Sequence, residues 1–373
     1  MKQHFKYFTI FFCITLICFL NCKKDKNITG PSTTGPVEMG ETTEDIEEFE
    51  LRLEDFRRTL HIPGCSYSIA KNGNMVRARG FGFADVENGI KATPNTQYRL
   101  ASLTKTFAST VIMQLVEEGL INLEDPVSDY GIELESPGII RVKHLFTHTS
   151  EGVPGSYYQY NGGRYLLLDQ VIEQASGKTF AEQLAERIVI PLGLRKTGPT
   201  PFVPAFYQIT GLDASQFIRN LALGYSSAGA LRQNYPIHFS SAAGLISTVI
   251  EVAEYSIAVD NNTLMSEETK QQVFTPAVSN SGETLPYGLG WFVQYEQGTK
   301  IIWHYGWWDA ISSLIIKIPE NELAFIICAN NDRLSGAYPG LGYGDITVSD
   351  VAMEFLDTFV FGTGELPETS LRK

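Results

Sequence analysis

Residues 98–120 read YRLASLTKTFASTVIMQLVEEGL, a short polar opening followed by a long apolar run. Apolar side chains from Phe107 onward recur at helical spacing with few charges between them, which predicts a helix buried on most sides. Ser102 opens this helix and Lys105 follows one turn later, so the two side chains lie on one helix face. A buried ammonium is costly unless the site uses it, so this pair is the first candidate for chemistry.

The pattern Ser-x-x-Lys is weak evidence by itself because it is short. It occurs three times in this chain, as Ser68/Lys71, Ser102/Lys105 and Ser370/Lys373. The first copy falls on a predicted strand, where residues three apart point to opposite faces, and the third lies in a polar terminal stretch. Only the second copy opens a helix, where backbone N–H groups and the helix dipole favour a developing oxyanion. The structural alternative is that Ser102 only caps the helix.

The composition of the chain limits its size class and its partners. With 373 residues, of which 43% are hydrophobic, it can bury the core of one large domain or of two closely packed ones. The formal net charge is -13 at pH 7, and no cluster of Lys and Arg forms a basic stripe. Because affinity for nucleic acid depends on neutralising phosphates, the sequence predicts no nucleic-acid partner.

The N-terminal segment has the layout of an export signal. Residues 1–21 place lysines ahead of a short apolar run, and Cys22 follows that run, as in a bacterial lipoprotein signal cut before a lipidated cysteine. A plain signal peptide or a retained N-terminal anchor is the alternative. Residues 22–42 are rich in small and charged residues, which predicts a flexible tether. We therefore expect an exported protein, held at a membrane by a lipid anchor in the periplasm or cell envelope.

Strand patterns at both ends of the chain indicate how the domain is built. Residues 65–82 alternate around Asn72-Gly73, which is a strong hairpin signal. Further strands are expected at about 289–296, 300–305, 311–317 and 323–329, and a last helix near 346–360. The middle of the chain is mainly helical, so we predict an α+β fold in which both chain ends build one antiparallel sheet and the middle forms a helical lobe. The domain is expected to span 43–361, with a C-terminal tail at 362–373.

Several ordered motifs support a family resemblance. They are FGFAD at 81–85, YRLASLTK at 98–105, HLFTHTS at 144–150, PLGL at 191–194, AGLIST at 243–248 and YGLGW at 287–291. In this order they resemble the beta-lactamase-related serine hydrolases, which include class C beta-lactamases, D-alanyl-D-alanine carboxypeptidases, D-aminopeptidases and esterases. The resemblance covers about residues 45–361 and implies the penicillin-recognising fold, as in the beta-lactamases and transpeptidases.

The family's second motif is Tyr-x-Asn, in which the tyrosine takes part in proton transfer. The best match is Tyr160-Asn161-Gly162, where the asparagine is displaced by one position or replaced by glycine. The resemblance implies that Tyr160 is catalytic and that Asn161 contacts substrate, while Tyr157 and Tyr158 compete for the tyrosine role. We expect the charge of Lys105 to lower the pKa of the phenol, so that either phenolate Tyr160 or neutral Lys105 takes the Ser102 proton.

The family's third motif, Lys-Thr-Gly in its beta-lactamases, corresponds to His304-Tyr305-Gly306 on a predicted strand. The resemblance implies that His304 binds substrate, as a weaker carboxylate clamp than lysine because imidazole is mostly neutral at pH 7. Gly306 is expected to let the substrate backbone approach the strand, and the Trp307 N–H to supply the second oxyanion donor beside that of Ser102. The alternative for His304 is a hydrogen-bonded, half-buried residue. One of Trp307 and Trp308 is expected to line the cleft.

Two further patterns have structural interpretations. His144 and His148 are four apart, as helical metal ligands can be, but no nearby cluster supplies further ligands, so we predict structural histidines and no metal site. Residues 224–228, GYSSA, nearly match the nucleophile elbow of alpha/beta-hydrolases. No strand pattern precedes them, and alanine replaces the second glycine, so they rank below Ser102.

Together these features predict a serine hydrolase that forms an acyl-enzyme on an ester or amide. The expected substrates are small esters or amides, or peptidoglycan-derived peptides, with an esterase, D-aminopeptidase or carboxypeptidase activity and weak beta-lactamase activity as a further option. This mechanism needs no metal or organic cofactor. The alternative is a penicillin-binding-like lipoprotein without turnover that binds cell-wall peptide or a partner, because the motif departures at Gly162 and His304 could remove catalysis.

Overall fold

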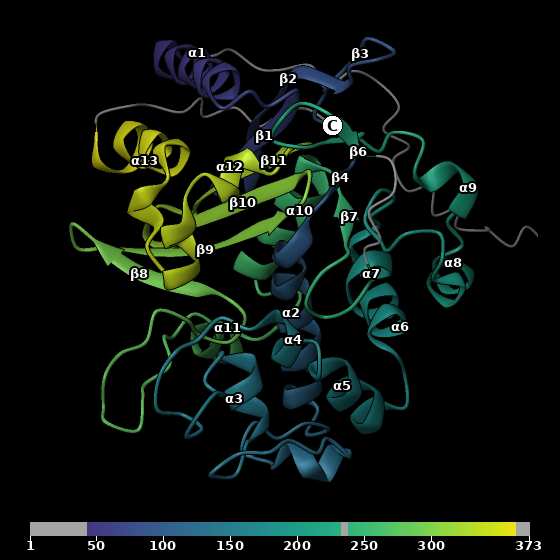
Figure 1. The fold of residues 1–373 in the computed structure, drawn as a ribbon, viewed down its shortest axis with the longest axis vertical. Helices are drawn as coiled ribbons and strands as arrows, with labels where there is room; N and C mark the ends of the chain where they lie inside the picture. Colours follow the sequence, from purple (N-terminus) through teal and green to yellow (C-terminus); the bar gives the residue numbers. More distant parts are fainter. Residues whose placement is uncertain (1–42, 233–237, 363–373) are drawn as a thin grey trace, which may run out of the picture. The chain divides into compact units, whose positions relative to one another are not determined.

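The computed structural model describes residues 43–232 and 238–362 (Figure 1). These residues belong to one compact unit, Pro36–Lys373. The predicted signal segment, Cys22, the tether and most of the predicted tail lie outside the described residues, so those predictions are not tested by the fold.

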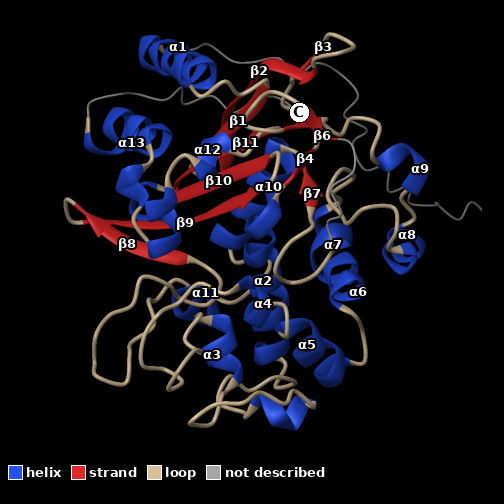
Figure 2. Ribbon diagram, in the orientation of Figure 1, coloured by secondary structure: helices blue, strands red, loops and turns tan. Residues whose placement is uncertain are grey.

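One sheet dominates the described part of the chain. It has seven antiparallel strands in the order β3-β2-β1-β11-β10-β9-β8 (Figure 2). The strands are β1 Gly64–Lys71, β2 Asn74–Asp85, β3 Ile90–Lys91, β8 Phe292–Glu296, β9 Thr299–Trp308, β10 Ile311–Ile318 and β11 Leu323–Ala329. Strand β1 pairs with β11, so the two ends of the domain meet in the middle of the sheet. The predicted sheet from both chain ends is confirmed.

Helices and short strand pairs fill the rest of the described chain. The helices are α1 Glu44–Thr59, α2 Thr104–Glu117, α3 Val142–Phe146, α4 Gly162–Tyr165, α5 Leu168–Ser176, α6 Phe180–Leu184, α7 Ile190–Leu192, α8 Pro204–Thr210, α9 Ala214–Phe217, α10 Val249–Asp260, α11 Glu267–Val273, α12 Arg333–Gly336 and α13 Asp350–Leu356. The short strands are β4 Tyr98–Arg99 with β7 Ile246–Ser247, and β5 Gly224–Tyr225 with β6 Leu231–Arg232. A 3₁₀ turn, η1 Ala101–Leu103, runs directly into α2, and another, η5, covers Pro339–Tyr343.

Each face of the sheet has its own hydrophobic core. One face packs against α1 and α13, and the other packs against the helical lobe, with α2 and α10 nearest to it (Figure 1). Side chains alternate between the two cores along each strand, so Ile302 faces the lobe and Trp303 faces the terminal helices. Cys65 and Cys328 are both free and buried, and they belong to opposite cores, which keeps them from pairing.

Two element boundaries differ from the sequence prediction. Strand β8 begins at Phe292 rather than near 289, because Gly290 turns the chain with a φ of +87° over α2, where a Cβ would lie 2.6 Å from the Cβ of Ser109. Strand β9 runs to Trp308 rather than to about 305. The last predicted helix is present as α13, which continues into a π-helical segment at Asp357–Phe361 and is preceded by a 3₁₀ turn at Ile346–Val348. The hairpin at Asn72-Gly73 is confirmed, with φ values of 51° and 72° at its two turn residues.

A buried ion pair fastens α1 to the sheet. Glu50 on α1 accepts hydrogen bonds from Arg77 at 2.7 Å and from the hydroxyl of Tyr67 at 2.5 Å, and it also contacts Arg79. Glu50 and Arg77 are 2% and 5% exposed. Burial by itself would raise the pKa of the Glu50 carboxyl, but the hydrogen bonds from Arg77 and Tyr67 hold it below its ordinary value.

We predict that Glu50→Ala destabilises the protein by about 3–5 kcal/mol, because it leaves the Arg77 guanidinium buried without its partner. The measurement is the free energy of unfolding in urea. Glu48→Ala is the matched control on the same helix, since the Glu48–Arg52 pair is largely exposed, and it should leave the stability nearly unchanged. Equal losses in the two variants would contradict a special role for the buried pair.

Candidate active site

Ser102 lies where η1 meets α2, on a backbone that is held in an uncommon conformation. Ala101, just before it, has a φ of 46°, in the left-handed region that non-glycine residues seldom adopt. The Thr104 hydroxyl bonds the Ala101 carbonyl at 2.6 Å and accepts the Leu245 N–H at 3.1 Å, which ties the turn to the neighbouring segment. Such strained positions often mark functional sites. The turn therefore presents Ser102 at the boundary between the lobe and the sheet.

Lys105 is the buried partner of Ser102. Its Nζ lies 3.0 Å from Ser102 Oγ and 2.8 Å from the carbonyl oxygen of Ala242. The side chain is 1% exposed, and burial lowers the pKa of Lys105 to about 7. Near neutral pH a large fraction of this amine is therefore uncharged, so its lone pair can accept the Ser102 proton while one N–H donates to Ala242.

Tyr160 also faces this pair, but its acid–base state differs from the sequence prediction. Lys105 Nζ lies 5.0 Å from the centre of the Tyr160 ring. Burial and the neighbouring Tyr305 raise the pKa of the Tyr160 phenol far above its usual range. Ser102 is near enough to Tyr160 to reduce the rise of the phenol pKa, although the Tyr160 hydroxyl and Ser102 form no well-aligned hydrogen bond. The expected lowering of the phenol pKa is wrong, because burial outweighs the charge of a largely neutral Lys105. The arrangement favours Lys105 as base and Tyr160 as a protonated phenol.

The two competing tyrosines have other contacts. The Tyr158 hydroxyl donates to the Gly342 carbonyl of η5 at 3.1 Å, and Tyr157 packs over Gly152. Of the three tyrosines in this loop, the structure brings Tyr160 to the serine and lysine.

Asn161 does not present a free amide to the cleft. Its Oδ1 accepts the Arg164 N–H at 3.0 Å as the N-cap of α4, and its Nδ2 donates to Glu151 at 2.7 Å. Both ends of the amide are engaged because helix α4 begins at the next residue. The structure therefore gives Asn161 a capping role, and its predicted contact with substrate stays a prediction.

His304 is fully buried on β9, and both of its ring nitrogens are engaged. Nδ1 bonds the Tyr305 carbonyl at 2.7 Å, so it carries the proton, and Nε2 accepts the Tyr287 hydroxyl at 2.9 Å. Burial and the nearby Lys105 lower the pKa of His304 to about 3, so the imidazole is neutral. His304 is hydrogen-bonded, as the structural alternative has it, but fully rather than half buried, and its predicted contact with substrate stays a prediction.

Gly306 lets strand β9 touch the turn that carries Ser102. A Cβ at Gly306 would lie 2.0 Å from the Leu100 carbonyl oxygen and 2.4 Å from Ser313 Oγ, so any larger residue would push the strand away. The close contact brings the backbone of β9 to the side of η1. This close contact is with the chain's own turn; the predicted approach of a substrate backbone to Gly306 stays a prediction.

The register of β9 leaves the Trp307 N–H available. A two-residue turn joins Trp308 of β9 to Ile311 of β10, and these two residues form a hydrogen-bonded pair. Hydrogen-bonded and non-hydrogen-bonded pairs alternate along an antiparallel ladder, so the next pair, Trp307 and Ser312, is not hydrogen-bonded. The N–H of Trp307 therefore points away from β10. Strand β8 pairs with β9 only as far as Trp303, so nothing in that strand takes up this N–H. The Trp307 and Ser102 N–H groups are thus candidates for an oxyanion hole.

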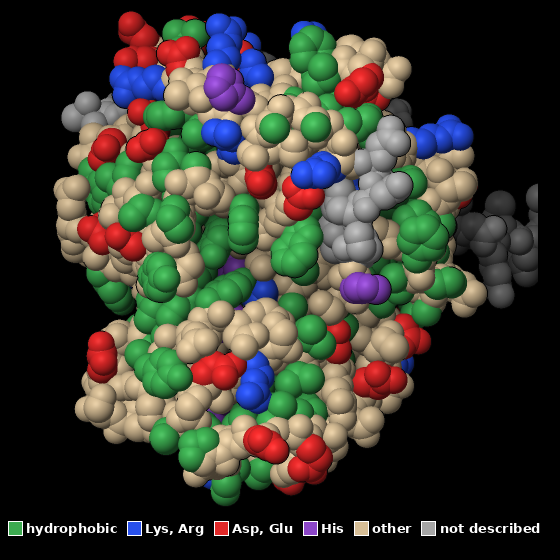
Figure 3. Space-filling view, in the orientation of Figure 1, with side chains coloured by type: hydrophobic (Ala, Val, Ile, Leu, Met, Phe, Trp, Pro, Cys, Tyr) green, Lys and Arg blue, Asp and Glu red, His purple; other side chains and the backbone are tan. Residues whose placement is uncertain are grey.

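The surface around the site is hollowed. Figure 3 shows a depression flanked by hydrophobic side chains, with basic and histidine side chains at its floor. Trp308 is 57% exposed and shares a strand face with Gly306, while Trp307 packs on Gly336 of α12. Both tryptophans are thus partly exposed, and the lining of the cleft by one of them stays a prediction.

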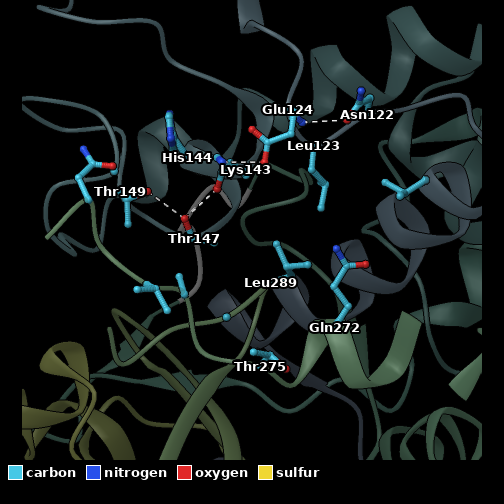
Figure 4. Close-up of a pocket in the computed structure, with 16 residues that line it drawn as sticks. Asn122, Leu123, Glu124, Lys143, His144, Thr147, Thr149, Gln272, Thr275 and Leu289 are labelled. Atoms are coloured by element: carbon cyan, nitrogen blue, oxygen red, sulfur yellow. Dashed lines mark hydrogen bonds and ion pairs between the residues drawn. The ribbon is translucent and has the colours of Figure 1, made fainter. Parts of the chain in front are cut away.

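A second cavity lies elsewhere in the lobe. It has a volume of about 430 Å³ and is lined by α3 and the segment 272–289, with His144 in its wall (Figure 4). None of the predicted catalytic residues lines it. His144 Nδ1 accepts the Arg141 N–H at 3.1 Å at the start of α3, which is a structural role. In the described residues no group of three or more ligating side chains could hold a metal ion.

The elbow-like serine is also structural. Ser226 Oγ accepts the Ala230 N–H at 3.2 Å within the β5–β6 hairpin. Ser226 therefore caps the turn between two strands, whereas a nucleophile elbow joins a strand to a helix.

A family model described as Beta-lactamase matches residues 49–341. The chain belongs to the beta-lactamase family. Two solved structures share the fold of this family member. The octameric penicillin-binding protein homologue from Pyrococcus abyssi has a TM-score of 0.72 and 26% identity, covering 88% of this chain and 79% of its own. The penicillin-binding protein from Bacillus halodurans has a TM-score of 0.64 and 22% identity, and the match covers 77% of this chain and 96% of that protein. At this identity the match is evidence for the fold only. The predicted α+β penicillin-recognising fold is confirmed.

Two curated relatives come from Staphylococcus aureus. Teichoic acid D-alanine hydrolase is 31% identical over 245 residues, which cover 58% of this chain and 56% of that protein. Protein flp is 24% identical over 338 residues, covering 78% and 64%. The chain thus spans less than two thirds of the length of either relative. Among the residues that the structure describes, no helix is long and apolar enough to cross a membrane.

We predict that the reactivity of Ser102 rises as pH rises through about 7, because only deprotonated Lys105 can accept the serine proton. The measurement is the rate of fluorophosphonate labelling of Ser102 against pH, followed by intact-protein mass spectrometry. Lys105→Arg should abolish fast labelling at every pH, since arginine stays protonated. A rise centred near about pH 10, the ordinary lysine range, would contradict the lowered pKa.

Proposed function

We propose that this protein is a serine hydrolase that cleaves small acyl esters or amides through an acyl-enzyme, with D-alanyl esters as the preferred class. The contact of Lys105 Nζ with Ser102 Oγ at 3.0 Å, inside a buried site that lowers the pKa of the amine to about 7, carries this proposal. A nucleophile with an adjacent uncharged base is the arrangement that acyl transfer requires.

In the first step Ser102 Oγ attacks the substrate carbonyl carbon, and its proton passes to neutral Lys105. The oxyanion that forms accepts hydrogen bonds from the N–H groups of Ser102 and Trp307. Collapse of this intermediate breaks the ester or amide bond, and the leaving group takes a proton from Lys105, with the Tyr160 hydroxyl as relay. The products of this step are the free alcohol or amine and acylated Ser102 with neutral Lys105.

In the second step a water molecule attacks the acyl carbon while Lys105 takes one of its protons. Collapse of the second tetrahedral intermediate breaks the bond to Ser102 Oγ, which recovers its proton from Lys105. The acid is released, and both residues return to their starting protonation states.

The neutrality of the site favours this substrate class. His304 is uncharged and internally bonded, and the Asn161 amide is engaged as a cap, so neither offers a cationic clamp for a free carboxylate. A beta-lactam or peptide carboxylate would gain little there. A D-alanyl ester carries an ammonium, which a site with neutral imidazoles does not repel. Similarity to teichoic acid D-alanine hydrolase supports the same choice.

The test compares Ser102→Ala with Ser226→Ala on a panel of chromogenic acyl esters and D-alanyl esters. Loss of nucleophile should lower turnover at least about 10³-fold and abolish fluorophosphonate labelling. Ser226→Ala, whose serine only caps a hairpin, should keep both. Labelling without turnover would favour the alternative of a binding protein, and full activity of Ser102→Ala would overturn the proposal.

We also propose that the protein is exported and anchored through a lipid on Cys22, which rests on the sequence of residues 1–22. Mass spectrometry of the protein isolated from membranes should find its N-terminus at Cys22 with a diacylglyceryl group. An N-terminus at another residue, or an unmodified Cys22, would contradict the anchor.

A further inference from the structure

One histidine holds the whole segment around the proposed proton-relay tyrosine. The His148 carbonyl accepts the Gln159 N–H at 2.8 Å, and His148 Nδ1 accepts the Asn161 N–H at 3.1 Å. Between these two bonds the imidazole stacks on the Tyr160 ring, with 4.3 Å between ring centres and 29° between planes. The backbone and side chain of His148 thus hold three consecutive residues, 159–161, in place.

The backbone at His148 is adapted to this task. Its φ of 56° is left-handed, a conformation that costs conformational energy for a non-glycine residue. Its neighbours hold that turn: the Thr147 and Thr149 hydroxyls bond each other at 2.9 Å, and Thr147 Oγ1 donates to the Lys143 carbonyl at 2.8 Å (Figure 4). The left-handed turn lets the carbonyl and the ring of one residue reach the same neighbouring segment.

The ring is neutral and surrounded by the groups of the active site. It is 2% exposed, and burial together with Lys105 and His304 keeps the pKa of His148 well below its ordinary value. Because Nδ1 accepts an N–H, the proton is on Nε2. The titratable groups that face it are Lys105, His304, Tyr158, Tyr160, Tyr165 and Tyr287. The ring packs on Tyr160 and Tyr165, whose own rings lie 5.0 and 5.1 Å from Lys105 Nζ, so it backs the aromatic shell of the amine without adding a second positive charge.

We propose that His148 is the positioning residue of this site: its ring and backbone hold the Tyr160 hydroxyl toward Ser102 and keep water away from Lys105. This role rests on the proposed hydrolase mechanism. It differs from the purely structural role that the sequence suggests for His148, and the two roles predict different measurements.

The experiment compares His148→Asn with His144→Asn. Asparagine tolerates a left-handed backbone, and its Oδ1 can replace Nδ1 as acceptor, so His148→Asn removes mainly the ring that packs on Tyr160 and Tyr165 beside Lys105. His144 is the matched control, because it is also buried and its Nδ1 also accepts a backbone N–H at 3.1 Å, but it lies at the second cavity.

For His148→Asn we expect Ser102 labelling and ester turnover to fall about 10–100-fold, as misplacement of a catalytic group does. The pH midpoint of labelling should also move upward from about 7, toward the ordinary lysine value, because water reaches Lys105. His144→Asn should leave both the rate and the midpoint unchanged, whatever its effect on thermal stability.

His148→Phe separates the two contributions of the side chain. It keeps an apolar ring against Tyr160 and Tyr165 but loses the acceptor for the Asn161 N–H. We expect the pH midpoint to stay near that of the wild type while the labelling rate falls. A midpoint that moves as far as in His148→Asn would overturn the role in excluding water.

The outcomes also separate this proposal from the proposed function. If Ser102→Ala abolishes turnover while His148→Asn keeps the wild-type rate and midpoint, the positioning role is wrong and the hydrolase proposal stands. If Ser102→Ala stays active, the hydrolase proposal itself fails.

Discussion

The burial of the Lys105 amine beside Ser102 is the constraint on which the rest of this site depends. The amine is 1% exposed, and its polar contacts are a serine hydroxyl and the Ala242 carbonyl. Because neither partner carries a negative charge, the buried amine is stable mainly in its neutral form, which is the form that can accept a proton. Burial thus lowers the pKa of Lys105 and makes it a candidate base near neutral pH.

The aromatic groups around this amine follow from the same constraint. Tyr160 and Tyr165 place their rings 5.0 and 5.1 Å from Lys105 Nζ, and His148 packs behind Tyr160. Burial raises the pKa of the phenols and lowers the pKa of the imidazoles, so the shell stays uncharged at neutral pH. Such a shell excludes water and gives hydrogen-bond donors, but it offers no permanent charge. This is the physical basis on which we propose an ester or amide rather than a substrate recognised through its carboxylate.

The sheet brings the two halves of the site together. Strands β1 and β11 join the beginning and the end of the domain, and the chain between β3 and β8 forms the lobe that carries Ser102, Lys105 and Tyr160. The possible oxyanion donor comes from β9, which reaches η1 because residue 306 has no side chain. The proposed catalytic groups therefore come together only when the lobe packs on the sheet. We expect a change at this contact to disturb the proposed site before it unfolds the lobe or the sheet.

The sequence by itself determined the features that depend on local periodicity: the helix that places Lys105 one turn after Ser102, the hairpin at Asn72-Gly73 and the strands at both chain ends. The tertiary structure alone decided which tyrosine meets the serine, that Asn161 caps a helix, and that Tyr160 and His304 are both neutral. It also revealed the contacts of His148, whose sequence signals were its place in the HLFTHTS motif and a spacing typical of metal ligands. These properties depend on burial and on contacts between distant segments, which spacing along the chain does not contain.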